Sequence, residues 1–271
     1  MEKLNLNKWN TTMGTTSDNR SLAQIKVDDY NATEGKLTGY DCPKCRNKGD
    51  IMWLREDQSF AVYDCPCKNI RRNYRKLDRA GLLESVKKLT FDTFLVLDSW
   101  QRPLKEGVME YARSDGGWLL LSGSAGCGKT HLCTAVCAER IGRYADMQYI
   151  RWIEESRSLK TMNFGDPRMG QRLQELKSTP FLYIDDLFKT ARGADGRSNP
   201  TQADVQLAFE ILDYRYNNHL STILSTEKSI TELMNIDSAI ASRIIERCGQ
   251  HIYNLGNHPE RNYRLRRKKQ T

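Results

Sequence analysis

The stretch GSAGCGKT at residues 123–130 has the pattern G-x-x-x-x-G-K-[ST], and its neighbours suit that pattern. The apolar run at 118–121 predicts a strand before it, and residues 131–141 predict a helix after it. Such a loop turns backbone N–H groups toward phosphates, while its Lys neutralises β/γ charge and its Thr ligates Mg²⁺. A plain Gly-rich turn, the alternative, does not explain the Lys-Thr pair. We therefore expect ATP and Mg²⁺ to be bound here, by Gly123, Ser124, Ala125, Gly126, Cys127, Gly128, Lys129 and Thr130.

Short apolar runs alternate with helix-compatible segments along the rest of the chain. Further strands are predicted at 147–153, 181–184, 222–226 and 252–255, and helices at 98–113, 201–218, 229–234 and 237–248. A sequence that alternates strands with helices forms a mostly parallel sheet with helices on both faces. The sequence therefore predicts an α/β fold of the P-loop type.

Two carboxylates follow the predicted strand at 181–184. In a P-loop fold, the strand beside the loop brings such acids next to the triphosphate. Asp185 is predicted to hold Mg²⁺ together with Thr130, and Asp186 to orient or deprotonate the attacking water. Thr226 ends the next strand, where its hydroxyl either contacts the γ-phosphate or the water, or caps the following turn.

Four of the eight cysteines lie close together, as Cys42-x-x-Cys45 and Cys65-x-Cys67. The strand-like runs between the two pairs predict a hairpin. Four thiolates suit tetrahedral Zn²⁺, and a module this small needs the metal for stability. We therefore expect a structural zinc site in a small zinc-ribbon-like module. Four reduced cysteines on a loop are the alternative.

The net charge of +8 is concentrated in two places. Six basic residues and no acidic one lie in 261–271, and a second basic group lies on an amphipathic helix predicted at 69–83. Such patches suit a polyanion such as nucleic acid, whereas a solvated tail and helix face are the alternative. No apolar run reaches the roughly 18 residues of a membrane span, and no secretory signal is evident, so we expect a cytoplasmic location.

Four further residues have two interpretations each. Phe91 and Phe94 are expected either in the core or as a wall for the adenine ring. Arg243 suits an arginine finger that reaches a neighbouring subunit's γ-phosphate, and Arg247 competes for that role. Surface ion pairs are the plainer interpretation of both arginines.

The motifs GSAGCGKT, FLYIDD, FEILDYRY, ILSTE and SRIIER resemble, in order and spacing, the DnaC/DnaI group of AAA+ proteins, which are bacterial and phage helicase loaders. The CPKC…CPC module with its basic helix is similar to the N-terminal part of Gram-positive and phage members. The resemblance assigns Walker A to Lys129 and Thr130, Walker B to Asp185 and Asp186, the arginine finger to Arg243, and sensor 1 to Thr226. The chain departs from many members at Ser225-Thr226-Glu227, where they have Thr-Ser-Asn. No separate helical lid is apparent, and Arg264 is a candidate for a second sensor.

The sequence divides into four expected regions: a flexible N-terminal arm (1–38), the zinc module with its basic helix (39–84), an ATPase domain that the resemblance assigns to the AAA+ type (85–260) and a basic tail (261–271). The resemblance also implies ATP hydrolysis, slow unless stimulated by self-association into an AAA+ oligomer. The implied partners are single-stranded DNA and the replicative hexameric helicase, which the protein would load during replication initiation. An IstB-type transposition helper, against which the cysteine module argues, and a nucleotide-switched DNA-binding adaptor without significant turnover are the alternatives.

Overall fold

The computed structural model describes residues 21–144, 146–162, 166–190 and 199–266. The chain divides into two compact units, Met1–Cys65 and Pro66–Thr271. Within the described ranges, no helix combines the length and apolarity that a membrane span requires.

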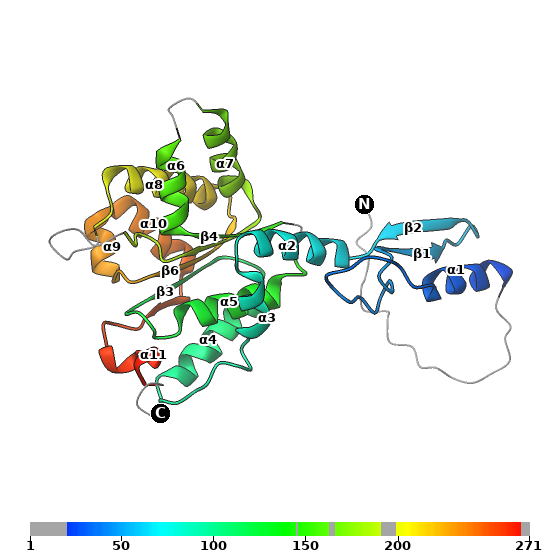
Figure 1. Cartoon of the computed structure of the whole chain (residues 1–271), viewed down its shortest axis with the longest axis horizontal. Coiled ribbons are helices and arrows are strands. Elements are labelled where there is room, and N and C mark those ends of the chain that lie inside the picture. The colour runs from blue at the N-terminus through cyan, green and yellow to red at the C-terminus, as the bar shows by residue number, and fades with distance from the viewer. Residues whose placement is uncertain (1–20, 145, 163–165, 191–198, 267–271) are drawn as a thin grey trace. The chain divides into compact units, whose positions relative to one another are not determined.

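In the first unit, a helix packs on a two-stranded hairpin (Figure 1). Strands β1 (Asp50–Leu54) and β2 (Phe60–Asp64) pair antiparallel, as the sequence predicted. Helix α1 (Leu22–Ala32) lies in the predicted arm, where the sequence indicated only a short element at 25–30. Its Asn31 amide bonds both backbone groups of Met52, at 2.9 and 3.0 Å, so the side chain imitates a neighbouring strand. The first twenty residues of the arm lie outside the described residues.

A five-stranded parallel sheet forms the centre of the second unit (Figure 1). Its strands run in the order β4-β5-β6-β3-β7. Their bounds are β3 (Trp118–Ser122), β4 (Met147–Arg151), β5 (Phe181–Asp185), β6 (Ser221–Thr226) and β7 (Ile252–Asn254). The predicted α/β class and parallel sheet are confirmed.

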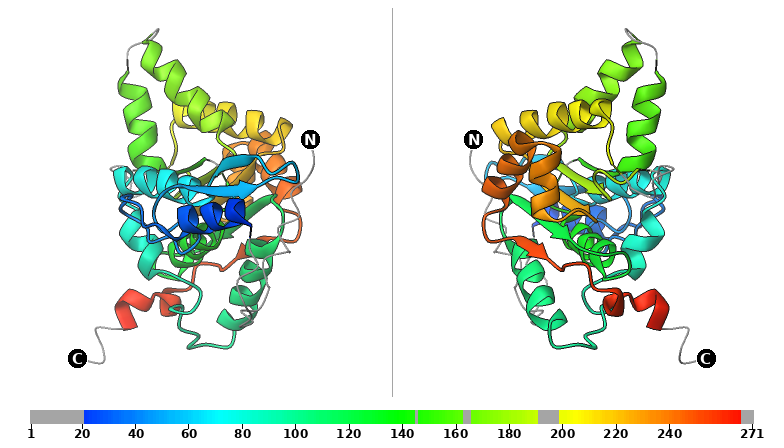
Figure 2. Two further views of the ribbon diagram at one scale, coloured as in Figure 1. Left: turned by 90° about the vertical axis from the view of Figure 1, so that its right-hand side faces the viewer. Right: turned by 90° about the vertical axis from the view of Figure 1, so that its left-hand side faces the viewer.

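Helices cover both faces of this sheet, as Figure 2 shows. One face packs against α2 (Cys67–Arg79), α3 (Leu83–Lys88), α4 (Gln101–Arg113) and α5 (Lys129–Arg140). The other packs against α6 (Trp152–Thr161), α7 (Pro167–Ser178), α8 (Gln202–Asn217), α9 (Ile230–Ile236) and α10 (Ser238–Cys248). Alternate side chains of β3 explain this: Leu119 and Leu121 enter the first core, while Trp118 and Leu120 enter the second. The chain ends with a 3₁₀ turn, η1 (Pro259–Arg261), and α11 (Tyr263–Arg266).

Helix α2 belongs to the second unit, whereas the sequence-based division kept it with the cysteine module. Its fully buried Asn73 donates 2.9 Å hydrogen bonds to the carbonyls of Ile141 and Tyr144. The same amide accepts a 3.0 Å bond from the backbone of Met147, the first residue of β4. A buried amide with three partners ties α2 firmly to the sheet.

A buried arginine on α8 caps the C-terminal end of α7. The guanidinium of Arg215 on α8 donates to the carbonyls of Leu176 and Thr179, at 3.1 and 2.7 Å. These carbonyls lie at the end of α7, where the last turn leaves acceptors unpaired. Burial disfavours the charged form of Arg215 and lowers its pKa to about 9. The hydrogen bonds to carbonyl dipoles offset part of this cost of burying a cation.

Candidate nucleotide-binding site

The GSAGCGKT loop lies between β3 and α5, as the sequence predicted. Gly126 and Gly128 have φ values of 79° and 101°, in the left-handed region that favours glycine. A β-carbon on Gly128 would lie 2.9 Å from the ring of Phe94. The Lys129 ammonium donates to the loop's own carbonyls at Gly123 and Ser124, at 2.8 and 2.9 Å. Charged phosphate oxygens are stronger acceptors than these carbonyls, so the loop fits a triphosphate.

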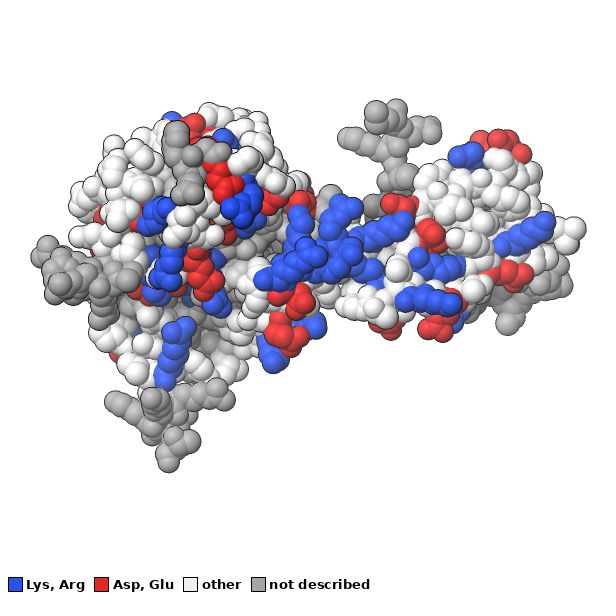
Figure 3. Space-filling view, turned by 45° about the horizontal axis from the view of Figure 1, so that its top comes forward, with Lys and Arg blue, Asp and Glu red and all other residues white. Residues whose placement is uncertain are grey.

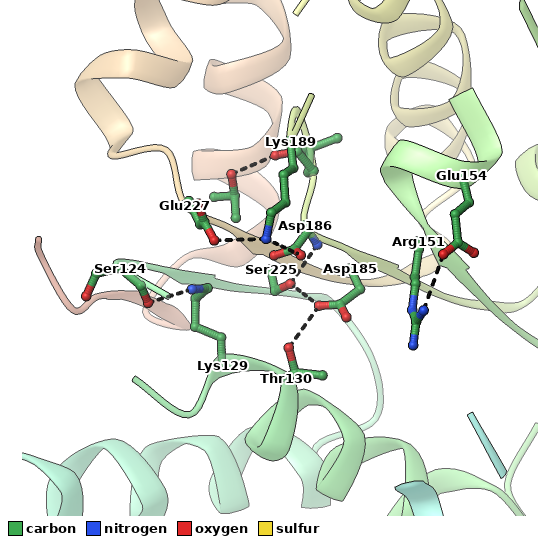
Figure 4. Close-up of polar contacts among 12 residues, drawn as sticks. Ser124, Lys129, Thr130, Arg151, Glu154, Asp185, Asp186, Lys189, Ser225 and Glu227 are labelled. Carbon is green, nitrogen blue, oxygen red and sulfur yellow. Dashed lines mark hydrogen bonds and ion pairs between the residues drawn. The ribbon is translucent and has the colours of Figure 1, made fainter. Parts of the chain in front are cut away.

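Asp185 ends β5 directly opposite the first turn of α5 (Figure 4). Thr130 Oγ1 donates to Asp185 Oδ1 at 3.3 Å, which pairs the two residues predicted to hold Mg²⁺. Hydroxyls of Tyr183 (2.7 Å), Tyr149 (3.3 Å) and Ser225 donate to the same carboxylate. Burial raises the pKa of Tyr183 well above its ordinary value, so that phenol remains a donor. A carboxylate and a hydroxyl oxygen at this position fit a hard cation such as Mg²⁺.

Asp186 follows on a tight turn and has a carboxylate that is already paired. Lys189 Nζ lies 2.9 Å from Asp186 Oδ2 and 3.0 Å from Glu227 Oε1. Glu227 follows β6, so the ammonium joins the ends of two neighbouring strands (Figure 4).

A cavity of about 380 Å³ brings these groups together. Its lining includes residues 125–131 of the loop and α5, and also Asp186, Lys189 and Glu227. A cavity of this size suits a small-molecule ligand. Phe94 lines it and meets His131 edge-on at 5.2 Å, and both Phe94 and Phe91 belong to the hydrophobic core. The core interpretation is therefore confirmed for both phenylalanines, and a wall for the adenine ring stays a prediction for Phe94, which also lines the cavity.

The C-terminal segment closes over the loop. Gly126 O accepts a 3.0 Å hydrogen bond from the backbone of Tyr263, and Ser124 N donates to Gly256 O at 3.0 Å. Arg261 and Arg264 line the same cavity. Residues 261–266, which the sequence analysis assigned to a basic tail, thus pack on the phosphate loop, while 267–271 lie outside the described residues.

Thr226 is not among the residues that line the cavity. It is fully buried, donates to Leu187 O at 2.8 Å and accepts from the backbone of Lys228 at 3.1 Å. These contacts match the capping interpretation of its hydroxyl. From this strand end, the following residue, Glu227, reaches the cavity instead.

The two candidate arginine fingers lie on α10, away from the lining of their own chain's cavity. Arg243 pairs with Asp213 at 2.8 Å and lies over the ring of Phe209. Arg247 contacts His219 at 2.7 Å. A finger role for Arg243 toward a neighbouring subunit stays a prediction.

The four clustered cysteines are free and buried, and their sulfur atoms lie within 4.8 Å of one another. Tetrahedral Zn²⁺ with bonds of about 2.3 Å places its thiolates about 3.8 Å apart. Sγ of Cys42 and Sγ of Cys65 are 3.7 Å apart, and Gly49 N donates to Cys45 Sγ at 3.2 Å. Cys67 completes the set. The cluster therefore fits zinc, as the sequence predicted.

Sequence reasoning missed the lysine and the hydroxyls that surround the two aspartates. Tyr183 precedes Asp185 by two residues, so both side chains lie on one face of β5. Lys189 follows Asp186 by three residues, which is contact range once the chain turns back. Both spacings are visible in the sequence. The turn after β5, which brings Lys189 into contact with Asp186, is not.

A family model described as IstB-like ATP binding protein matches residues 68–271. The phage-like element PBSX protein XkdC of Bacillus subtilis (strain 168) is 29% identical over 244 residues, which cover 86% of this chain and 89% of that protein. The crystal structure of the DnaC helicase loader is 23% identical, with a TM-score of 0.47, over 63% of this chain and 97% of that one. The crystal structure of DnaI is 21% identical, with a TM-score of 0.49, over 66% and 92%. The match over 68–271 agrees with the site described above, and the chain belongs to the IstB-like ATP-binding protein family.

Proposed function

We propose that this protein hydrolyses ATP and uses it to help place a replicative hexameric helicase on single-stranded DNA. The observation that carries the proposal is the cavity itself, which joins Lys129, Thr130 and Asp186 in a chain that also carries a four-cysteine cluster. The family match establishes ATP binding only, so hydrolysis and helicase loading are our inferences.

The arrangement supports hydrolysis because each task has a residue in reach. Lys129 would neutralise phosphate charge, and the Thr130–Asp185 pair would hold Mg²⁺, which when bound would supply positive charge beside the transferred phosphoryl group. Asp186 lines the cavity and would orient the attacking water once its carboxylate is released from Lys189. Arg243 of a neighbouring subunit completes the site in an assembly, so turnover rises with protein concentration.

The basic face of α2 supports contact with nucleic acid. Arg72, Arg75 and Arg79 are exposed on this helix. Figure 3 shows lysine and arginine side chains gathered over it. Phosphate contacts dominate such binding and release counterions, so affinity for single-stranded DNA falls steeply as salt rises.

A loading assay tests the proposal. Purified protein is mixed with the hexameric helicase of its source organism and circular single-stranded DNA, and helicase retained on the DNA is measured with ATP. Wild type should increase retention, whereas Lys129→Ala and Asp186→Asn should not. If neither retention nor a protein–helicase complex is observed with wild type, the loader proposal fails.

The family match favours one second candidate, an IstB-type transposition helper ATPase. Its partners would be a transposase and duplex DNA. A pull-down with both kinds of partner separates the two functions: a complex with the helicase supports the loader, and a complex with the transposase supports the helper. If ATP binds without turnover even with DNA and helicase present, the protein is a nucleotide-switched adaptor.

A further inference from the structure

Lys189 has an unusual place in the cavity, between two carboxylates from two strand ends. Its ammonium contacts Asp186 at 2.9 Å and Glu227 at 3.0 Å, and all three residues line the cavity that contains Lys129 and Thr130 (Figure 4). Although partial burial opposes it, hydrogen bonds to these carboxylates raise the pKa of Lys189. The side chain is therefore a cation at the pH of the cell.

A strained turn places this cation. Asp186 and Phe188 have φ values of 57° and 61°, which side chains other than glycine rarely adopt. The turn is held from β6, because Asp186 N donates to Ser225 Oγ at 2.9 Å and Leu187 N donates to Ser225 O at 2.8 Å. When several contacts hold a strained turn in place at a site, the residue that the turn positions, here Lys189, is a candidate for a functional role.

An exposed ion pair contributes little stability, and Lys189 is 38% exposed. Its effect on chemistry is larger, because one of the two carboxylates that it holds, Asp186, is the one proposed above to act on water. A carboxylate that accepts a hydrogen bond from an ammonium is a poorer base and is turned away from other partners. In this structure the Asp186 carboxylate is thus engaged by Lys189.

We propose that Lys189 senses the γ-phosphate: it holds Asp186 and Glu227 when the γ position is empty, and it turns to the phosphate when ATP is bound. The inference rests on the proposed ATPase function and adds a residue to it. The γ-phosphate of ATP carries more charge than either carboxylate, so it competes for the ammonium. The exchange frees Asp186 to orient water only when there is a γ-phosphate to attack. ADP lacks that group and leaves the Lys189–Asp186 pair in place.

Discrimination between ATP and ADP tests this assignment. Equilibrium binding of a non-hydrolysable ATP analogue and of ADP, both with Mg²⁺, is measured for wild type, Lys189→Met and Lys189→Arg. Lys189→Met should weaken binding of the ATP analogue roughly tenfold and change binding of ADP by less than about twofold, because one charge-assisted hydrogen bond is lost only with ATP. Lys189→Arg should keep most of the discrimination.

Lys87→Met is the matched control, because Lys87 forms a 3.0 Å pair with Glu84 at the same i, i+3 spacing and is not among the residues that line the cavity. It should leave both affinities unchanged. If Lys189→Met keeps the wild-type ratio of the two affinities, or weakens both equally, the assignment is overturned. Should thermal unfolding show that Lys189→Met is not folded, Lys189→Gln gives the same test. If wild type binds neither nucleotide, the proposed function fails, and this inference with it.

Discussion

Replacing Gly126 with alanine should disrupt the phosphate loop and the C-terminal segment together. Gly126 has a φ of 79°, and a β-carbon there would lie 2.6 Å from Cγ of Asn262 and 3.3 Å from its Cα. The side-chain oxygen of Asn262 also accepts a 3.1 Å bond from the backbone of Arg264. The added methyl therefore displaces the segment as well as straining the loop.

The expected cost follows from two contributions. A non-glycine residue in the left-handed region costs about 1–2 kcal/mol. Displacing the segment loses the 3.0 Å hydrogen bond from Tyr263 N to Gly126 O, and such a bond is worth about 1 kcal/mol. The sum, about 2–3 kcal/mol, lowers the melting temperature of a domain this size by about 5–10 °C.

Thermal unfolding and nucleotide binding are the assays. Gly170→Ala is the control, since Gly170 lies exposed on α7 with no atom within 4 Å of an added β-carbon, and it should stabilise by about 0.5–1 kcal/mol. Adding Asn262→Ala to Gly126→Ala removes the closest clash and should restore part of the loss. If Gly126→Ala melts like wild type, or if Asn262→Ala restores nothing, the packing of this segment on the loop is refuted.

Four further substitutions give distinct readouts. Arg215→Met leaves buried carbonyls unpaired and should cost about 2–4 kcal/mol in urea denaturation; an unchanged midpoint would argue against the buried cap. Although burial opposes it, the hydrogen bond from Lys160 helps hold the pKa of Asp204 below its ordinary value, so this carboxylate stabilises the fold above about pH 4 and the contribution is lost as pH falls through its lowered pKa. Asp204→Asn should therefore flatten the fall of melting temperature between pH 5 and pH 3 (about one unit either side of the free value), and an unaltered slope would contradict this. Cys45→Ser should reduce zinc, measured by elemental analysis, from about one ion per chain; an equal content in both proteins would exclude the four-cysteine site. Arg243→Ala should abolish any rise of specific ATPase activity with protein concentration, and persistence of that rise would remove the finger assignment.

The fold was largely predictable because its signals are local. Strands β3 and β5 are mostly apolar and are buried along their whole length, and such runs stand out in a sequence. Helix α1 was harder, because it has no apolar stripe and is held by the amide contact of Asn31 with Met52. That contact joins residues that are 21 positions apart, and no periodicity encodes it.

The site was predictable in part. The Thr130–Asp185 pair follows from two motifs, but their strands β3 and β5 are separated by β6, whereas the sequence analysis expected them to be adjacent. The position of Glu227, and the burial of Thr226 beside it, depend on how the turn after Asp186 packs on the end of β6. The approach of Tyr263 to Gly126 depends on the path of the chain after β7. Both are tertiary contacts, which the order of residues along the chain does not specify.

The most direct measurement is equilibrium binding of ATP with Mg²⁺ to wild type and to Lys129→Ala, with melting temperatures to confirm that both are folded. Wild type should bind ATP, and loss of the ammonium proposed to contact the phosphates should weaken binding by at least about tenfold. Equal affinity of the two proteins for ATP would contradict the placement of the triphosphate in the GSAGCGKT loop.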